Sequence, residues 1–329
     1  MFNTTRTLVY ATFVIMMGSL LYGQTAQAQS WPTKPIRFII PYPPGSGIDI
    51  IARLLGPRIG ETLGQPLIVE NRPGAGASIG VDAVAKATPD GYVIGFADTG
   101  PLANNPALYP DLPYAPMRDL VPIIQVGTLP FMLVVNPSLG VNSVKELIAA
   151  AKLDPGKINY ASVGNGSSVH LTTELFKKQA GIDMTHIPYK GSAPALVDVV
   201  SGRTPVMFVN LLSGLSLVKS GKLRVLAVAS GKRIQTLPDV PTVAEAGVPG
   251  YQSEAWIGII VPTGTPAPIV KRLNAEFNRV LEIPSVRDQL LHQGGVQVVG
   301  GTPAQFSSLI DREIKYWGKL VKETGAQVD

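Results

Sequence analysis

Three observations predict an α/β protein built from two doubly wound lobes with a ligand cleft between them. The chain has 329 residues, 45% of them hydrophobic, which is enough for about two domains with full cores. Short apolar runs alternate with amphipathic segments, as in a parallel sheet covered by helices. The alternation starts afresh near residue 131, which indicates a second sheet.

The first lobe is expected to begin with a buried strand over 36–42, followed by a helix from about residue 48. Strands over 67–71 and 92–97 and a helix over 78–87 continue the alternation, so a parallel sheet is predicted. Apolar residues at 3.6-residue spacing define the buried face of the first helix: Ile48, Ile51, Ala52, Leu55, Ile59 and Leu63.

The second lobe is expected to hold strands over 131–136, 159–162, 184–189, 206–210 and 224–230. A capping box that starts at Ser143 opens its first helix, and Gly181 closes its second. The chain then returns to complete the first lobe with a strand over 257–261 and two helices, which start near Pro266 and Thr302.

The N-terminus has the features of a signal peptide. Arg6 gives a positive start, residues 8–22 are largely apolar, and Ala26-Gln27-Ala28 matches a cleavage site. The apolar run is shorter than the roughly 20 residues of a membrane span, although an uncleaved anchor stays an alternative. The predicted division is 1–28 signal peptide, 29–130 plus 254–329 lobe 1, and 131–253 lobe 2.

Composition argues against several classes of function. Charged residues make up 16% of the chain, and the net charge of +5 is scattered, so no nucleic-acid partner is expected. The absence of cysteine excludes thiolate metal sites, disulfides and cysteine nucleophiles. The histidines, His170, His186 and His292, show no metal-ligand spacing, so no metal and no other cofactor is expected.

Glycine-rich loops join strands to helices at 41–49 and 162–170. Glycines let backbone N–H groups approach a ligand, and a helix N-terminus carries partial positive charge. Because doubly wound sheets bind ligands at the carboxyl ends of their strands, both loops are predicted anion cradles. A plain turn and an ordinary helix cap are the alternatives.

Two further strand-to-helix loops, 189–195 and 210–213, complete the set. Two facing lobes would place all of these loops across one cleft. Two cradles in one cleft suit a ligand that carries two carboxylates.

A secreted α/β-hydrolase is the main enzymatic alternative. Gly76-Ala77-Ser78-Ile79-Gly80 matches the nucleophile elbow G-x-S-x-G, and His292 lies downstream as a possible base. The elbow requires its serine on a sharp turn directly after a strand, but residues 72–75 intervene after the strand that ends at Asn71. Small residues at a helix start explain the match better.

Nine short motifs follow one another along the chain, at 31–36, 41–49, 69–76, 89–92, 105–109, 164–166, 188–191, 237–242 and 264–268. In this order they resemble the extracytoplasmic tripartite tricarboxylate receptor family, also called the Bug family and typified by TctC. The resemblance implies a type II periplasmic-binding-protein fold and a periplasmic, non-enzymatic protein. It also implies a carboxylate ligand and a membrane permease partner with one large and one small subunit; we expect a monomer.

The resemblance implies that the first and second loops approach the ligand's carboxyl groups and that the other two loops line the cleft. One departure from the family's common pattern is Phe208-Val209-Asn210, where an acid often replaces Val209. This makes an amino-acid ligand less favoured than a dicarboxylate, a tricarboxylate or an aromatic carboxylate. The predicted ligand-binding residues are Tyr42, Pro43, Gly45, Ser46, Asp49, Thr99, Ser162, Gly164, Asn165, Gly166, Ser167, Ser168, Tyr189, Gly191 and Asn210.

A third possibility is a sensory module that presents its ligand to a membrane signalling partner. Uptake and sensing use the same clamp around a ligand, so the sequence leaves both roles open.

Overall fold

The structure, a computed structural model, describes residues 31–324, apart from the side chains of residues 293, 294 and 324. The chain divides into two compact units, Met1–Thr33 and Lys34–Asp329, and the account below is of the second. The predicted signal peptide lies outside the described residues. Within those residues, no helix combines the length and hydropathy that crossing a bilayer requires.

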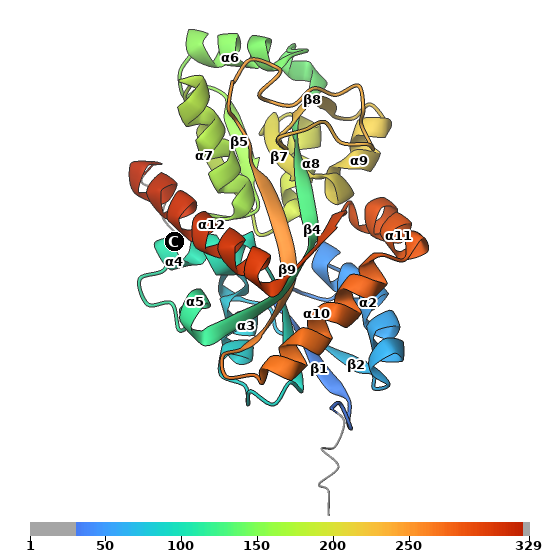
Figure 1. Cartoon of the computed structure of the whole chain (residues 1–329). Coiled ribbons are helices and arrows are strands. Elements are labelled where there is room, and N and C mark those ends of the chain that lie inside the picture. The colour runs from blue at the N-terminus through green and yellow to red at the C-terminus, as the bar shows by residue number, and fades with distance from the viewer. Residues whose placement is uncertain (1–30, 325–329) are drawn as a thin grey trace, which may run out of the picture. The chain divides into compact units, whose positions relative to one another are not determined.

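Within residues 31–324, ten strands form one sheet in the order β2-β1-β3-β9-β4-β7-β5-β6, with β10 and β8 also paired to β4. Figure 1 shows β4 and β9 side by side through the middle of the unit. The strands are β1 (Ile36–Ile40), β2 (Leu67–Asn71), β3 (Val93–Asp98), β4 (Leu120–Val135), β5 (Asn159–Ser162), β6 (Thr185–Pro188), β7 (Val206–Asn210), β8 (Arg224–Val228), β9 (Glu254–Pro262) and β10 (Gln297–Gly300).

The long strand β4 belongs to two regions of the sheet. From Leu120 to Pro130 it pairs with β9, and from Phe131 to Val135 it pairs with β7 and β8. We call β2, β1, β3, β9, β10 and the first part of β4 the first sheet region. The rest of β4 with β7, β5, β6 and β8 forms the second sheet region.

The expected parallel pairing is right for only part of each region. Strands β2, β1 and β3 are parallel, as are β6, β5 and β7. The expectation is wrong around β4, which pairs antiparallel with β7, β8, β9 and β10, and for the β3–β9 pair. The reason is that β9 re-enters the first region between β3 and β4 and runs opposite to both.

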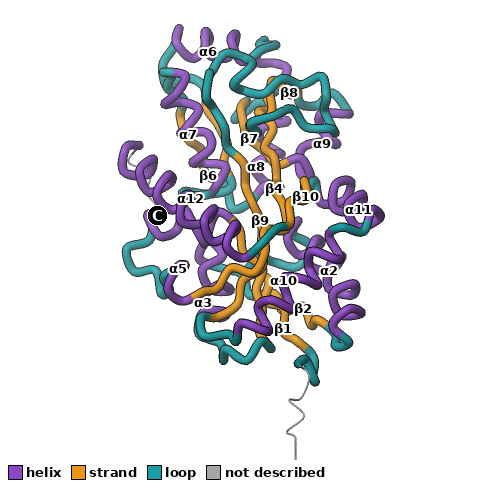
Figure 2. Tube along the Cα trace, viewed as in Figure 1, coloured by secondary structure: helices purple, strands orange, loops and turns teal. Residues whose placement is uncertain are grey.

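Helices lie on both sides of the strands, as Figure 2 shows in purple and orange. Around the first region they are α2 (Gly47–Leu63), α3 (Ser78–Ala85), α4 (Asn105–Leu108), α5 (Pro116–Asp119), α10 (Ala267–Leu281), α11 (Pro284–Gly294) and α12 (Pro303–Thr324). Around the second region they are α6 (Val144–Leu153), α7 (Ser168–Ala180), α8 (Ser192–Ser201) and α9 (Leu211–Lys219). Short turns of other helix types occur at η1 (Ala75–Ala77), η2 (Gly100–Asn104) and η3 (Pro137–Leu139).

Aromatic contacts fix the helices to the strands. Phe306 of α12 meets Trp256 of β9 edge to face, with ring centroids 5.5 Å apart. The same ring fills the space above Gly258, where the Cβ atom of a larger residue would lie only 2.3 Å from the Phe306 ring. A glycine at this position therefore lets α12 pack directly on the sheet.

Candidate functional site

All of the sequence-predicted site residues lie where the chain leaves a strand for a helix. They lie at or after the last residues of β1, β3, β5, β6 and β7, which places them at the carboxyl ends of strands in both sheet regions. Ligands of open α/β sheets bind at this edge. We therefore take the loops after these strands as the candidate site.

Asp49 braces the first loop from inside. Its side chain is buried, and it accepts hydrogen bonds from Gly45 N–H and from Asn71 Nδ2, both at 2.8 Å. Arg53 adds an ion pair at 3.0 Å. Burial alone would raise the pKa of Asp49, but the hydrogen bonds from Arg53, Gly45 and Asn71 outweigh it and lower that pKa below its ordinary value. The carboxylate is thus occupied within the protein.

The donors that remain in the first loop belong to the first turn of α2. Ser46 caps this helix by accepting from Asp49 N–H at 3.3 Å, and its own N–H donates to Pro43 O. Among the described residues, the N–H groups of Gly47 and Ile48 have no acceptor. Such first-turn N–H groups are suited to an anion.

The first loop lies against the start of α9 in the second sheet region. A Cβ built on Gly47 would stand 3.0 Å from Leu212 Cδ2, the end of a flexible side chain, so the two residues lie close together. Loops from both sheet regions are therefore brought together at the N-termini of α2 and α9.

Tyr42 is bonded to an acidic residue that the sequence reading missed. Its hydroxyl donates to Asp98 Oδ2 at 2.5 Å, and Gly100 N–H donates to Asp98 Oδ1 at 3.0 Å. Burial raises the pKa of Asp98 to about 6, although these two hydrogen bonds oppose the rise. Burial, followed by the Asp98 charge, holds the pKa of Tyr42 well above its ordinary value. An acid whose pKa is raised by burial thus adjoins the first loop.

Thr99 has a different environment from the one predicted for a ligand contact. Its side chain is buried, and its Oγ1 accepts from Trp256 N–H at 2.9 Å. The hydroxyl therefore joins the end of β3 to β9.

The second loop uses two of its predicted donors internally. Gly166 N–H donates to His170 Nδ1 at 3.0 Å, and Gly164 N–H donates to Ser162 Oγ at 3.1 Å. Ser167 caps α7 by accepting from His170 N–H at 3.2 Å. The N–H groups of Asn165, Ser168 and Val169 have no acceptor within residues 31–324. These three groups, rather than that of Gly166, are the donors available to an anion.

Two stacked histidines pack against the second loop and are hydrogen-bonded to it. The rings of His170 and His186 are parallel to within 8°, with centroids 3.9 Å apart. His186 Nε2 shares a 2.6 Å hydrogen bond with Ser162 Oγ, and the ring of Tyr160 stacks on His186. Burial lowers the pKa of His170, which keeps Nδ1 an acceptor for Gly166. The histidines are structural parts of the loop.

The third and fourth loops contribute helix starts. The Tyr189 hydroxyl donates to Asp198 Oδ2 at 2.8 Å, so it bonds to α8. Gly191 precedes α8 with φ of +112°, a conformation that favours glycine. Asn210 caps α9 by accepting from Ser213 N–H at 2.8 Å.

Asn104 is a second residue that the sequence reading missed. It ends the π-helix η2, its side chain is fully buried, and its Nδ2 donates to Ser168 Oγ at 3.4 Å. The contact joins η2, which follows β3, to the N-terminus of α7. A π-helical segment leaves no readable pattern in the sequence, so only the structure brings Asn104 to the loops.

The hydrolase alternative lacks its required geometry. Ser78 follows the 3₁₀ turn η1 rather than a strand, is buried, and its Oγ accepts from Asn105 Nδ2 at 2.8 Å. The nucleophile-elbow reading is therefore wrong on the structural requirement that defines it. The described residues also hold no cluster of His, Asp and Glu suited to a metal ion.

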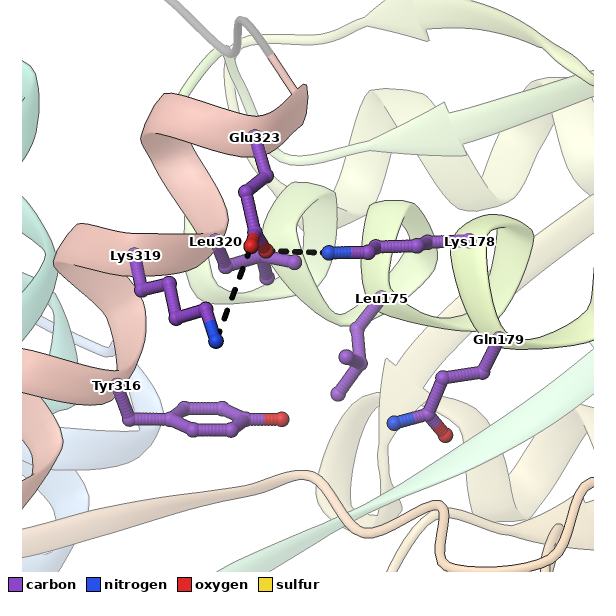
Figure 3. Close-up of a pocket in the computed structure, with 7 residues that line it drawn as sticks. All are labelled: Leu175, Lys178, Gln179, Tyr316, Lys319, Leu320 and Glu323. Atoms are coloured by element: carbon purple, nitrogen blue, oxygen red, sulfur yellow. Dashed lines mark hydrogen bonds and ion pairs between the residues drawn. The ribbon is translucent and has the colours of Figure 1, made fainter.

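A small cavity lies elsewhere, between α7 and α12, with a volume of about 240 Å³ (Figure 3). Glu323 of α12 forms ion pairs with Lys178 of α7 and, at 3.9 Å, with Lys319. Leu175 and Tyr316 also line it. This cavity adjoins the C-terminal half of α7, whereas the second loop lies at the opposite end of that helix.

Comparisons with known proteins identify relatives across nearly the whole chain. A family model described as tripartite tricarboxylate transporter family receptor, TctC, matches residues 51–326. The protein BugT of Bordetella pertussis is 39% identical over 327 residues, which cover 99% of this chain and 99% of BugT.

Solved structures are similar over the same extent. Rpa4515 of R. palustris, solved with adipate, has a TM-score of 0.83 and 37% identity, covering 91% of this chain and all of its own. The periplasmic binding protein BugD has a TM-score of 0.79 and 32% identity, and the match covers 91% of this chain and 100% of BugD. MatC of Rhodopseudomonas palustris, solved with bound malate, has a TM-score of 0.78 and 31% identity, and the match covers 88% of this chain and 100% of MatC. These likenesses confirm the predicted fold class, a two-lobed α/β fold of the periplasmic-binding-protein type.

Proposed function

The chain belongs to the tripartite tricarboxylate transporter receptor family, and from this premise we propose that it is a periplasmic solute-binding protein for a small carboxylate. In this role it binds and releases its ligand unchanged. The observation that carries the proposal is the likeness to Rpa4515, which was solved with adipate and matches 91% of this chain at 37% identity.

The strand-to-helix loops support a carboxylate as the ligand. The N–H groups of Gly47 and Ile48 on one side, and of Ser168 and Val169 on the other, lie in the first turns of α2 and α7. Two sets of donors at positive helix ends suit an acid with two carboxylates. The other predicted residues would line these loops or hold them in place around the ligand: Tyr42, Pro43, Gly45, Ser46, Asp49, Thr99, Ser162, Gly164, Asn165, Gly166, Ser167, Tyr189, Gly191 and Asn210.

We assign the two sheet regions to two lobes, 29–130 plus 254–329 and 131–253. The change of partners in β4 between Pro130 and Phe131 supports the first boundary. The start of β9 at Glu254, opposite Pro130, supports the second. Rotation about these two strands would open and close the loops around a ligand, as in other periplasmic binding proteins.

The liganded protein then delivers its cargo to a membrane permease with a large and a small subunit. Export through the predicted signal peptide, residues 1–28, would place it in the periplasm as a monomer. Delivery to a permease and presentation to a signalling partner would use the same closed form, so ligand binding alone does not distinguish them. Deletion of the permease genes does, because only delivery requires the permease. Loss of uptake in that strain supports delivery.

A thermal-shift screen over succinate, adipate, malate, citrate and benzoate tests ligand binding. A ligand at a hundredfold excess over its Kd stabilises the folded protein by about 2.7 kcal/mol, which raises the melting temperature. The absence of any shift across the panel would argue against a carboxylate receptor.

Replacement of Ser168 by proline tests the donors of α7. Ser168 is the first residue of the helix and follows Ser167 in extended conformation, so proline fits there. Proline removes the N–H group and also the hydroxyl that accepts from Asn104 Nδ2, whereas alanine removes the hydroxyl alone. We expect the best ligand of the panel to bind Ser168→Pro at least about tenfold more weakly than Ser168→Ala, with similar unfolding transitions for the two variants. The matched variant Ser168→Ala keeps the N–H and should bind more tightly than Ser168→Pro. Equal affinities of the two variants would remove this N–H group from the site.

A further inference from the structure

One buried polar side chain beside the N-terminus of α7 has an oxygen that accepts no hydrogen bond from the described residues. Asn104 is 0% exposed. Its Nδ2 donates to Ser168 Oγ, whereas its Oδ1 accepts a hydrogen bond from no residue that the structure describes. A buried acceptor without a donor is unfavourable, because it has lost water without replacement. We therefore expect Asn104 Oδ1 to accept a hydrogen bond from a bound molecule.

The unused acceptor stands beside unused donors. Asn104 contacts Ser168, whose N–H group, together with that of Val169, has no acceptor within the described residues. The 3.4 Å contact joins η2, which follows β3, to the first residue of α7, so the group lies where loops of both sheet regions meet. A molecule at this place meets N–H donors and a carbonyl acceptor next to each other.

A plain carboxylate satisfies only the donors. Its oxygens are acceptors, so they bind the N–H groups of α7 but repel Asn104 Oδ1. A hydroxyl on the carbon next to the carboxylate supplies an O–H donor, and its oxygen lies close enough to the carboxylate for adjacent partners to bind both. Resting on the proposed function, we infer that Asn104 is a specificity-determining residue that selects a 2-hydroxycarboxylate over the corresponding unsubstituted acid.

The opposite orientation of the amide makes a different prediction. If Ser168 Oγ donated to Asn104 Oδ1, the Nδ2 group would face the ligand and would strengthen every carboxylate alike. Selectivity between paired acids therefore distinguishes an acceptor at this position from a donor, whereas affinity for a single acid does not.

The test is a cycle of two proteins and two ligands, measured by titration calorimetry. Wild type and Asn104→Ala are each titrated with L-malate and succinate, and with 2-hydroxyadipate and adipate. We expect wild type to prefer the hydroxylated member by on the order of tenfold, the effect of one hydrogen bond. In Asn104→Ala the ratio falls to about one, chiefly through weaker binding of the hydroxylated acid. Asn142→Ala, which changes an exposed asparagine before α6, serves as the matched control and keeps the ratio.

The remaining outcomes separate a failure of this inference from a failure of the proposed function. Equal weakening of both acids in Asn104→Ala, or no preference in wild type, overturns it and leaves the proposed function intact. No binding of any acid by folded wild type overturns the proposed function and the inference with it. If Asn104→Ala does not fold, Asn104→Asp replaces it, since this near-isosteric variant keeps the acceptor. It should bind both acids more weakly through charge repulsion while retaining the preference; a lost preference overturns the inference.

Discussion

At the scale of single residues, Asp98 is the group whose charge responds to pH next to the first loop. Its carboxyl is hydrogen-bonded to the Tyr42 hydroxyl and to Gly100 N–H, and burial raises its pKa to about 6. A negative charge here opposes an anion in the neighbouring loop, so neutral Asp98 favours the proposed ligand. The ligand affinity and the free energy of unfolding should therefore both depend on whether Asp98 is ionised.

The stability effect has a definite sign. The folded-state pKa of Asp98 lies above the unfolded value of about 3.9, so the folded protein holds this proton more tightly. The resulting stabilisation is present below about pH 4 and is lost as pH rises through about 6. Asp98→Asn abolishes the titration, and its amide can still accept from Gly100 and donate to Tyr42. Relative to wild type, we expect its free energy of unfolding to rise by about 2 kcal/mol between pH 4 and pH 7. Urea unfolding across this range measures the difference, and a flat difference would contradict a raised pKa.

The sequence located the loops of the candidate site more readily than the roles of their residues. Glycine and serine after an apolar run mark a strand-to-helix turn wherever they occur. The partners of those residues come from distant segments: Asn71 binds Asp49, and Trp256 binds Thr99. Gly166 is bound by His170, only four residues away, but that bond depends on how the His170 ring is held. Local pattern cannot contain this information.

At the scale of elements, the short strands and helices were predicted where their periodicity was regular. The observed β2 and β7 coincide with the predicted 67–71 and 206–210. The first part of β4 was not predicted, because Pro122, Gly127 and Pro130 break its pattern. In the structure, shifts of register follow Pro122 and precede Gly127. A Cβ on Gly127 would stand 2.4 Å from Gln297 O, so this glycine is required by the approach of β10, which was also missed, as was α11.

Two glycines offer an opposed pair of alanine substitutions. In Gly258→Ala the new methyl group would overlap the Phe306 ring at 2.3 Å and Ile124 O at 2.5 Å, so α12 must shift from the sheet. We expect a loss of about 3 kcal/mol in the free energy of unfolding. Gly318 lies inside α12, where a built Cβ would have Ala107 Cβ as its nearest atom at 3.9 Å, so Gly318→Ala should be neutral or stabilising by up to about 1 kcal/mol. Chemical denaturation compares them; similar values for the two variants would refute the packing argument.

At the scale of the whole molecule, contacts between the sheet regions bear on the proposed closure. Asn104 reaches Ser168, and Gly47 lies against Leu212. A ligand that touches both sides of this junction binds the closed form better and shifts the population towards it. A ligand held by one side alone has no such preference.

Small-angle scattering measures that shift. With the strongest acid from the thermal-shift screen at saturation, we expect the radius of gyration to fall relative to the ligand-free protein. Ser168→Pro, at the same ligand concentration, should show a smaller fall because it is less fully occupied. An unchanged radius in saturated wild type would indicate a rigid arrangement and would require another signal for the permease.

The place of β9 also constrains how the chain can be made. This strand pairs with β3 on one side and with β4 on the other, yet it begins only at Glu254. Until residues 254–262 have been synthesised, β3 and β4 present two unpaired edges with an unfilled slot between them. The first sheet region therefore cannot be completed before residues 254–262 emerge, and its native contacts span long stretches of sequence, which slows folding. A first sheet region that stays incomplete until the last quarter of the chain emerges remains loose enough for a secretion channel to thread.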